Sequence, residues 1–351
     1  MKNTLIAGML TFAAAISSVQ SAGPSSVFLT LSPNQKTSGP VYKSDQTKYG
    51  NEVAKIIIQE AHKRAKHYLD YNTKEFNQAY YAFMVLALTV PRHEGFYVQF
   101  RETSPSECSD KRNLLQVAQE RGNKTAVKNY NQYLRNPANP YITTCNQVLN
   151  KKTINQIIAG GHDNTDIGMF QLSMRWHFAN FLANDFYKDV RETIRYGTAY
   201  LMYGDRAMQV SRAGVVPASG GGNNGFDGLL TTHQKHDCIS KGKDNEKVDF
   251  KNLIRGTWAR YNQGWSGKKA RKTEILCRFQ QKKLKDGSDN KYDLGNGFIS
   301  SLDATLKLDS STTFGSIAPA KISGNVKDAV AQIIKNFKKG KNKRKDIEKI
   351  L

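Results

Sequence analysis

A run of apolar residues, "AYYAFMVLALTV" (Ala79–Val90), constrains the fold of this chain more than any other stretch. It continues a helical pattern that begins near Asn72, where Glu75 stands three residues on, as in a capping box. Apolar residues cover most faces of the second half of this helix, so the helix should lie inside a core rather than on a surface. Pro91 is expected to end the helix and to leave Glu94 just beyond it. The pattern therefore predicts a carboxylate at the mouth of a buried helix.

The rest of the chain also carries mostly helical patterns. Apolar residues recur with helical spacing from Asn51 to Tyr68, ahead of the central helix. Further helices are predicted over Thr153–Ala159, Trp176–Asn184, Val190–Tyr203, Phe250–Tyr261 and Val326–Phe337. A glycine-rich loop is expected over Gly214–Asp227, and a short β-like or mixed segment after "KKLKDGSDNKYDLGNG". Strand signals are otherwise few, so the body should be mainly α-helical.

The N-terminus has the layout of a secretory signal peptide. Lys2 precedes a short apolar run (Leu5–Ile16) and small residues (Ser17–Ala22), which indicates a signal at 1–22 followed by an extended lead-in at 23–46. A membrane anchor is the alternative, but the run is shorter than a bilayer-spanning helix needs. We therefore expect a secreted or periplasmic protein.

Four cysteines follow the signal, at positions 108, 145, 238 and 277. An even number in an exported chain suggests two disulfides, most simply Cys108–Cys145 and Cys238–Cys277, although three connectivities remain open. The polar stretch 101–152, bracketed by the first pair, is expected to form an inserted lobe.

Lysines and arginines exceed acidic residues by 52 to 30, a formal net charge of +22. Such a charge favours an anionic partner: a nucleic acid, a lipid surface or a cell-wall polymer. Part of the excess lies in the C-terminal stretch "KNFKKGKNKRKDIEKIL", which can serve as an electrostatic tether. No nucleic-acid-binding motif is present, so nucleic acid is not the expected partner.

Four short pieces occur in one order along the chain: "RHEGF" (Arg92–Phe96), "DIGMFQLSMRWH" (Asp166–His177), "IRYGTAYLMYG" (Ile194–Gly204) and "WARYNQG" (Trp258–Gly264). Each alone has an ordinary explanation as a loop, a turn or a helix end. Together they resemble the lysozyme-like superfamily, specifically soluble lytic transglycosylases and goose-type lysozymes. Those families carry a catalytic Glu at a helix end, then Gly-Leu-Met-Gln, then a helix with Gly and Tyr-Leu, then Ala-Tyr-Asn-Ala-Gly.

The matching positions here are Glu94, Gly168–Gln171, Gly197 with Tyr200–Leu201, and Tyr261–Gly264, and the resemblance covers about Phe76–Trp265. Gly95 stands where those families usually carry Ser directly after the catalytic Glu, and Phe170 stands where they carry the Met of Gly-Leu-Met-Gln. The resemblance implies a lysozyme-like helical catalytic domain over 47–278, with the inserted lobe at 101–152 and a basic C-terminal extension at 279–351.

The resemblance implies cleavage of the MurNAc–GlcNAc β-1,4 bond of peptidoglycan, without a cofactor and by a monomer. Glu94 would be the general acid, and its apolar neighbours Val90, Phe96 and Tyr97 could keep it protonated near neutral pH. The substrate-binding candidates are Met169, Gln171, Tyr200, Tyr261 and Asn262.

A second carboxylate would distinguish hydrolysis from transglycosylation. A hydrolase of the inverting type needs one that activates water, roughly 6.5–9.5 Å from the acid. Asp163 and Asp166 precede Gly168 and are the candidates, while Ser173 stands where goose-type lysozymes have a later Asp. An Asp-rich turn is an equally good explanation of "GGHDNTD", so both outcomes stay open.

Two rival interpretations remain. His233, His236 and Asp237 resemble metal ligands by type, but their spacing is not that of the helical zinc-protease motif. A non-catalytic protein that binds an anionic polymer through its basic surface, on a lysozyme-like scaffold, is the alternative function.

Overall fold

The computed structural model describes residues 46–95, 166–173, 190–204, 207–211, 214–219, 223–235, 248–263, 296–308 and 322–351, with the isolated positions 97, 119, 122, 124, 127, 128, 131, 132, 135, 177, 180, 181, 184 and 186. The predicted signal, nearly all of the lead-in, the four cysteines with their disulfides, most of the inserted lobe and the helix over 153–159 lie outside the described residues.

The described part is mainly α-helical, which confirms the predicted class. Its helices are α2 (Gln46–Ala65), the 3-10 helix η1 (Lys66–Tyr71), α3 (Lys74–Gly95), α7 (Val190–Tyr203), α8 (Phe226–Lys235), α9 (Phe250–Gln263), α11 (Asn296–Thr305), α12 (Gly324–Lys339) and α13 (Lys345–Glu348). Its strands form two antiparallel hairpins, β1 (Asp166–Ile167) with β2 (Leu172–Ser173), and β3 (Met208–Ser211) with β4 (Gly214–Pro217).

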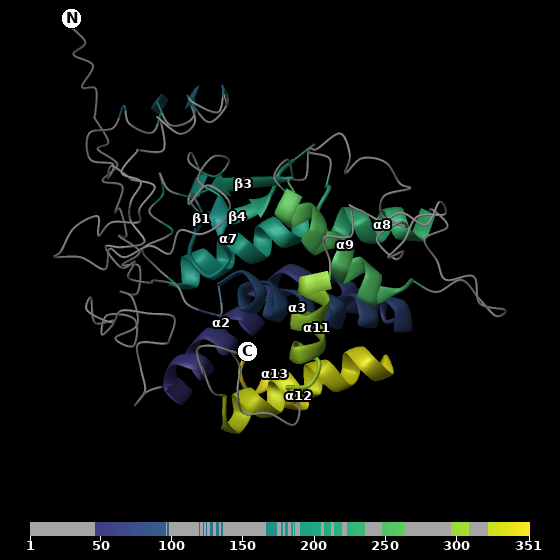
Figure 1. Ribbon diagram of the computed structural model, residues 1–351. Coiled ribbons are helices and arrows are strands. Elements are labelled where there is room, and N and C mark those ends of the chain that lie inside the picture. Colours follow the sequence, from purple (N-terminus) through teal and green to yellow (C-terminus); the bar gives the residue numbers. More distant parts are fainter. Residues whose placement is uncertain are drawn as a thin grey trace, which may run out of the picture.

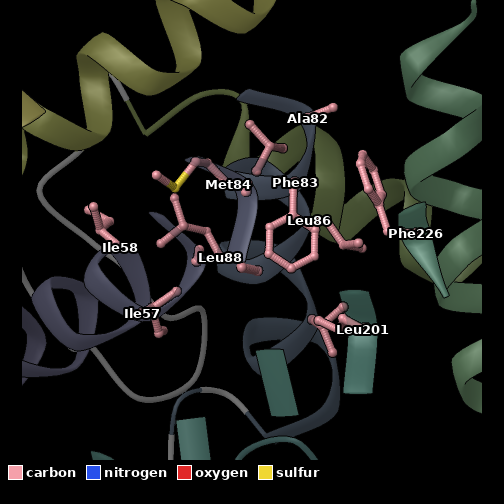
Figure 2. Close-up of a cluster of buried hydrophobic side chains, with 14 of the residues drawn as sticks. Ile57, Ile58, Ala82, Phe83, Met84, Leu86, Leu88, Leu201 and Phe226 are labelled. Atoms are coloured by element: carbon pink, nitrogen blue, oxygen red, sulfur yellow. The ribbon is translucent and has the colours of Figure 1, made fainter. Parts of the chain in front are cut away.

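The helix α3 forms the centre of the core, as its apolar pattern predicts. It contacts α2, α7, α9, α11 and α12, and every residue from Ala79 to Val90 is fully buried. In Figure 1, α7 and the β3–β4 hairpin lie on one side of α3, and α12 with α13 on the other. Figure 2 shows Phe83 and Leu86 of α3 among side chains of neighbouring helices, with Phe226 of α8 beside Phe83 at a ring-centroid distance of 5.3 Å.

Both ends of α3 differ slightly from the sequence-based expectation. The hydroxyl of Thr73 accepts a hydrogen bond from the N–H of Phe76 at 3.2 Å, so the cap is Thr73 rather than the preceding asparagine. The helix also continues through Pro91 to Gly95. The Tyr97 hydroxyl donates to the Leu88 carbonyl at 2.5 Å, and the Tyr97 N–H donates to the Pro91 carbonyl at 3.0 Å.

The expectation that Pro91 ends the helix, with Glu94 beyond it, is therefore wrong. A proline removes one helical hydrogen bond, here the one to the Ala87 carbonyl, but α3 continues to Gly95 and the Tyr97 N–H then closes it on the Pro91 carbonyl. Glu94 lies in the last turn of α3, on the helix itself.

Two further segments differ from the prediction. The residues after Gly297, expected to be β-like or mixed, belong to α11, whose buried Phe298, Leu302 and following Leu306 recur every four residues, as on one face of a helix. The predicted glycine-rich loop contains strand β4 and the start of α8. The predicted helices over 190–203, 250–261 and 326–337 are present as α7, α9 and α12.

Candidate active site

The carboxyl group of Glu94 meets the indole of Trp258 at the C-terminal end of α3. The Trp258 Nε1–H donates to Glu94 Oε1 at 2.6 Å, which joins α3 to α9. Burial raises the pKa of Glu94 from 4.5 to about 7, and the hydrogen bond from Trp258 opposes this by a smaller amount. Glu94 nevertheless keeps part of its surface exposed. A buried carboxyl whose pKa lies near neutral pH suits a proton donor.

The helix α11 holds Trp258 in place from the other side. The Phe298 ring stacks on the indole of Trp258, with centroids 4.7 Å apart and planes at 7°. The His93 ring meets the same indole edge-on at 4.9 Å, and His93 Nδ1 lies 2.9 Å from the hydroxyl of Ser301 on α11. Burial lowers the pKa of His93, so this imidazole is neutral at pH 7. The helix α11, which lies outside the part of the chain that resembles the lysozyme-like families, thus packs directly behind the Glu94–Trp258 pair.

The Gly-Met-Phe-Gln piece forms the tight turn between β1 and β2. Ile167 pairs with Leu172, and the two ends of the turn, Gly168 and Gln171, have positive φ angles of 73° and 45°. Both the backbone N–H and the side-chain amide of Gln171 donate to the Gly168 carbonyl, at 2.9 and 2.8 Å. One amide hydrogen of Gln171 therefore stabilises its own turn, and the partly exposed side chain is fixed in position.

Helices α7 and α9 hold this turn in place. The Tyr261 hydroxyl on α9 donates to the Phe170 carbonyl, and the rings of Tyr261 and Tyr200 lie 5.2 Å apart. On α7, a Cβ at Gly197 would lie 2.5 Å from Cγ of Phe170, so only glycine leaves room for the phenylalanine ring. Three of the four sequence pieces therefore meet at Phe170.

The fourth piece joins them through α9. Trp258 and Tyr261 are three residues apart on one helix, so their side chains lie on the same face. Trp258 contacts Glu94, and Tyr261 contacts the β1–β2 turn. The structure thereby brings the predicted acid and the predicted turn to one face of α9.

Behind Tyr200 lies a buried histidine. The His177 ring meets Tyr200 edge-on at 4.5 Å, and its Nδ1 lies 2.8 Å from the Tyr196 hydroxyl. Burial lowers the pKa of His177 to about 3, so it is neutral at every pH at which the protein would act. It positions the tyrosines and carries no charge to the site.

The other predicted site residues have different environments. Met169 is fully buried, so its side chain packs in the core, whereas Asn262 is exposed. Asp163 lies outside the described residues, and of Asp166 only the backbone, paired with Ser173, is described. The substrate-binding candidates thus differ widely in how much of each a ligand could reach.

Sequence reasoning did not single out Trp258 as the partner of Glu94. The signal was its position three residues before Tyr261 in "WARYNQG", which places both on one helix face. Phe298 and Ser301 carried no such signal, because they lie outside the four pieces.

The described residues contain neither a cluster of metal ligands nor a membrane-spanning helix. They contain no group of three or more His, Cys, Asp or Glu placed to hold a metal ion, and the side chains of His233, His236 and Asp237 are not among them. None of the described helices is both long and apolar enough to cross a bilayer.

Comparison with models of protein families, with curated proteins and with solved structures finds no match to this chain.

Proposed function

We propose that this protein is an exported enzyme that cleaves the β-1,4 bond between MurNAc and GlcNAc in peptidoglycan, with Glu94 as the general acid. The observation that carries the proposal is the Glu94–Trp258 pair: a carboxyl at a helix end, held at 2.6 Å by an indole N–H. Trp258 lies on the same face of α9 as Tyr261, which holds the Gly168–Gln171 turn. These are the pieces whose order resembles lytic transglycosylases and goose-type lysozymes.

The proposed reaction begins with proton transfer. The protonated carboxyl of Glu94 donates its proton to the glycosidic oxygen as the C1–O bond breaks, which leaves positive charge on the MurNAc ring. The Glu94 carboxylate formed in this step keeps the Trp258 hydrogen bond, now to a charged acceptor and therefore stronger. Where the muramyl 6-hydroxyl attacks C1, the Glu94 carboxylate takes the proton of that hydroxyl, and the acid is restored. Where water attacks with Asp163 as the base, Asp163 takes the proton of the water, and Glu94 regains a proton from solvent.

The attacking hydroxyl decides the product. The muramyl 6-hydroxyl would give a 1,6-anhydro end and needs no second carboxylate, whereas water gives a reducing end and calls for a general base. Asp163 is the candidate base. Mass spectrometry of the released muropeptides separates the two products by one water. A hydrolase would lose nearly all activity in Asp163→Asn, and a transglycosylase only a part.

The direct test is digestion of purified peptidoglycan by the wild type and by Glu94→Gln. Glutamine keeps an oxygen that can accept the Trp258 hydrogen bond but has no proton to donate, so cleavage should be lost and the fold kept. Glu75→Gln is the matched control, because Glu75 is a partly buried glutamate in the first turn of α3, at the opposite end of the helix from Glu94. Full activity in Glu94→Gln would sink the proposal. Binding without cleavage by the wild type would favour the non-catalytic alternative.

A further inference from the structure

A lysine-lined hollow lies at the other end of the molecule, where α12 turns into α13. It has a volume of about 670 Å³ and is lined by Lys335, Lys338, Lys339, Lys341 and Lys343, together with small and amide side chains and two aspartates. All five lysines are exposed. The hollow therefore concentrates positive charge in one concave surface.

Five lysines outnumber the two aspartates of the lining, Asp328 and Asp346, so the hollow keeps a net positive charge. Asp346 is already engaged by Lys349 at 2.9 Å and by the side-chain amide of Gln332 at 3.1 Å. Lys338 donates to the Leu306 carbonyl at 2.8 Å. No carboxylate in the part of the chain that the structure describes forms an ion pair with the other four lysines.

The helix dipole explains only part of this arrangement. Lys338 and Lys339 occupy the last turn of α12, where cations are favourable, and Gly340 closes the helix in the left-handed conformation. Lys335 lies a turn earlier, and Lys341 and Lys343 lie beyond the helix. Helix capping therefore leaves three of the five lysines unexplained.

The backbone that carries these lysines is rigidly held. The Asn336 side-chain amide and the Tyr81 hydroxyl both donate to the Lys343 carbonyl, at 2.5 and 3.3 Å. The side-chain oxygen Oε1 of Gln332 accepts from the backbone N–H of Asp346 at 3.0 Å. Because the turn is fixed before any ligand arrives, binding would cost only the ordering of the lysine side chains.

The hollow is far from Glu94. A Cβ at Gly340 would lie 2.9 Å from Cε of Lys74, so the turn sits at the N-terminal end of α3, whereas Glu94 lies at its C-terminal end. A helix of this length spans about 30 Å at about 1.5 Å per residue. The hollow is thus a second site and no part of the candidate active site.

The lining also narrows the class of ligand. Within the described residues it contains no aromatic side chain on which a nucleic-acid base could stack, and no large apolar side chain that could enter a bilayer. What it offers is a cluster of ammonium groups that could bind several phosphates. We propose that this hollow binds a linear phosphodiester polymer with an aliphatic backbone, and that it holds the protein on a surface rich in that polymer.

The test measures binding of the full-length protein to synthetic poly(glycerol phosphate) over a range of salt concentrations. The hollow variant is Lys335→Gln, Lys339→Gln, Lys341→Gln and Lys343→Gln combined. The control variant removes four exposed lysines that do not line the hollow: Lys48→Gln, Lys124→Gln, Lys128→Gln and Lys251→Gln. Both lose the same net charge.

We expect the hollow variant to bind at least about tenfold more weakly than the wild type near physiological salt, while the control stays within about twofold. The slope of log K against log salt should fall by about 3 in the hollow variant, because four fewer ammonium groups displace counterions. An equal loss in both variants would overturn the proposal, since the attraction would then follow net charge alone. The double variant Lys341→Gln with Lys343→Gln, confined to the turn, should give an intermediate loss and provides the test if the fourfold variant does not fold.

Two further probes identify the ligand class. A single-stranded oligonucleotide of equal charge and vesicles that contain an anionic phospholipid should both bind more weakly than poly(glycerol phosphate). Tighter, lysine-dependent binding of either one would contradict the proposal in favour of that ligand. Glu94→Gln should bind the polymer as the wild type does, so this result does not depend on the enzymatic proposal.

Discussion

Ionisable side chains have opposite environments at the two ends of α3, buried at one end and exposed at the other. At the C-terminal end the carboxyl of Glu94 is enclosed by Trp258, with Phe298 packed behind, and its pKa is raised to about 7. Near the N-terminal end Lys341 and Lys343 are exposed on a turn that hydrogen bonds hold in place. Burial makes a charge costly and so makes a proton available, whereas exposure keeps charges ionised and able to attract a distant polymer. The buried middle of α3 keeps the two environments apart.

Because the Glu94 end is buried, the largest loss of stability there should come from truncating a side chain that packs against the site. Phe298→Ala deletes a fully buried ring that stacks on Trp258 and leaves a cavity. We expect the free energy of unfolding to fall by about 3–5 kcal/mol, measured by denaturant unfolding. Tyr71→Ala, at a ring that is 60% exposed, is the control and should change little. A loss below about 1 kcal/mol in Phe298→Ala would mean that α11 does not support the site.

The charge state of Glu94 should be visible in stability as well as in activity. The unfolded chain loses this proton near pH 4.5 and the folded chain near pH 7, so the folded state becomes less stable as pH rises between the two values. The full cost above pH 7 is about 3 kcal/mol, at about 1.4 kcal/mol per pH unit. Glu94→Gln should therefore be more stable than the wild type at pH 8 by up to that amount, and equal at pH 4. Equal stability at both pH values would contradict the raised pKa.

The contact between α7 and the β1–β2 turn allows no side chain. Gly197→Ala would force a methyl group against the Phe170 ring and should cost about 1–3 kcal/mol. Combining it with Phe170→Leu should restore part of the loss, because the smaller side chain yields space. No recovery in the double variant would show that the two residues do not interact as described.

A smaller effect is expected where α9 holds the same turn. Tyr261→Phe removes the hydrogen bond to the Phe170 carbonyl but keeps the ring beside Tyr200. The expected cost is about 1 kcal/mol, with a larger relative fall in glycan cleavage because the turn is released near the substrate. Unchanged cleavage would argue that the turn takes no part in binding glycan.

The smallest effect should come from the lysine end. Replacing Lys335, Lys339, Lys341 and Lys343 by glutamine should change the free energy of unfolding by less than about 0.5 kcal/mol per substitution, since all four are exposed. It should leave peptidoglycan cleavage at low salt intact. A loss of cleavage as large as that of Glu94→Gln would show that the lysines belong to the catalytic site and are not a separate binding surface.

The spacing of apolar residues along the chain predicted which segments form helices and which helix is buried. The run Ala79–Val90 predicted the buried centre, and the amphipathic stretch Val190–Tyr203 matches α7 residue for residue. Pro91 misled because a proline removes only one helical hydrogen bond, and a contact from another helix, the Trp258–Glu94 hydrogen bond, holds the turn that follows. Sequence propensity at the proline carries no information about that contact.

The site shows the same division. The order of the motifs indicated Glu94 and Tyr261 as site residues. In the structure, one face of α9 contacts Glu94 through Trp258 and the β1–β2 turn through Tyr261. The support from α11 could not be predicted, because Phe298 reaches Trp258 across 40 residues of sequence through tertiary packing alone. A ring that stacks on another ring has no periodic signature.

The central claim, that Glu94 donates the proton, is tested most directly by the pH–rate profile of peptidoglycan cleavage in the wild type and in Trp258→Phe. The rate should fall with a single deprotonation centred near pH 7, the pKa of Glu94. Trp258→Phe keeps an aromatic ring beside Phe298 but removes the donor that stabilises the carboxylate, so the falling limb should move to higher pH by about one unit. A limb near pH 4.5, or one that does not move in Trp258→Phe, would contradict the account.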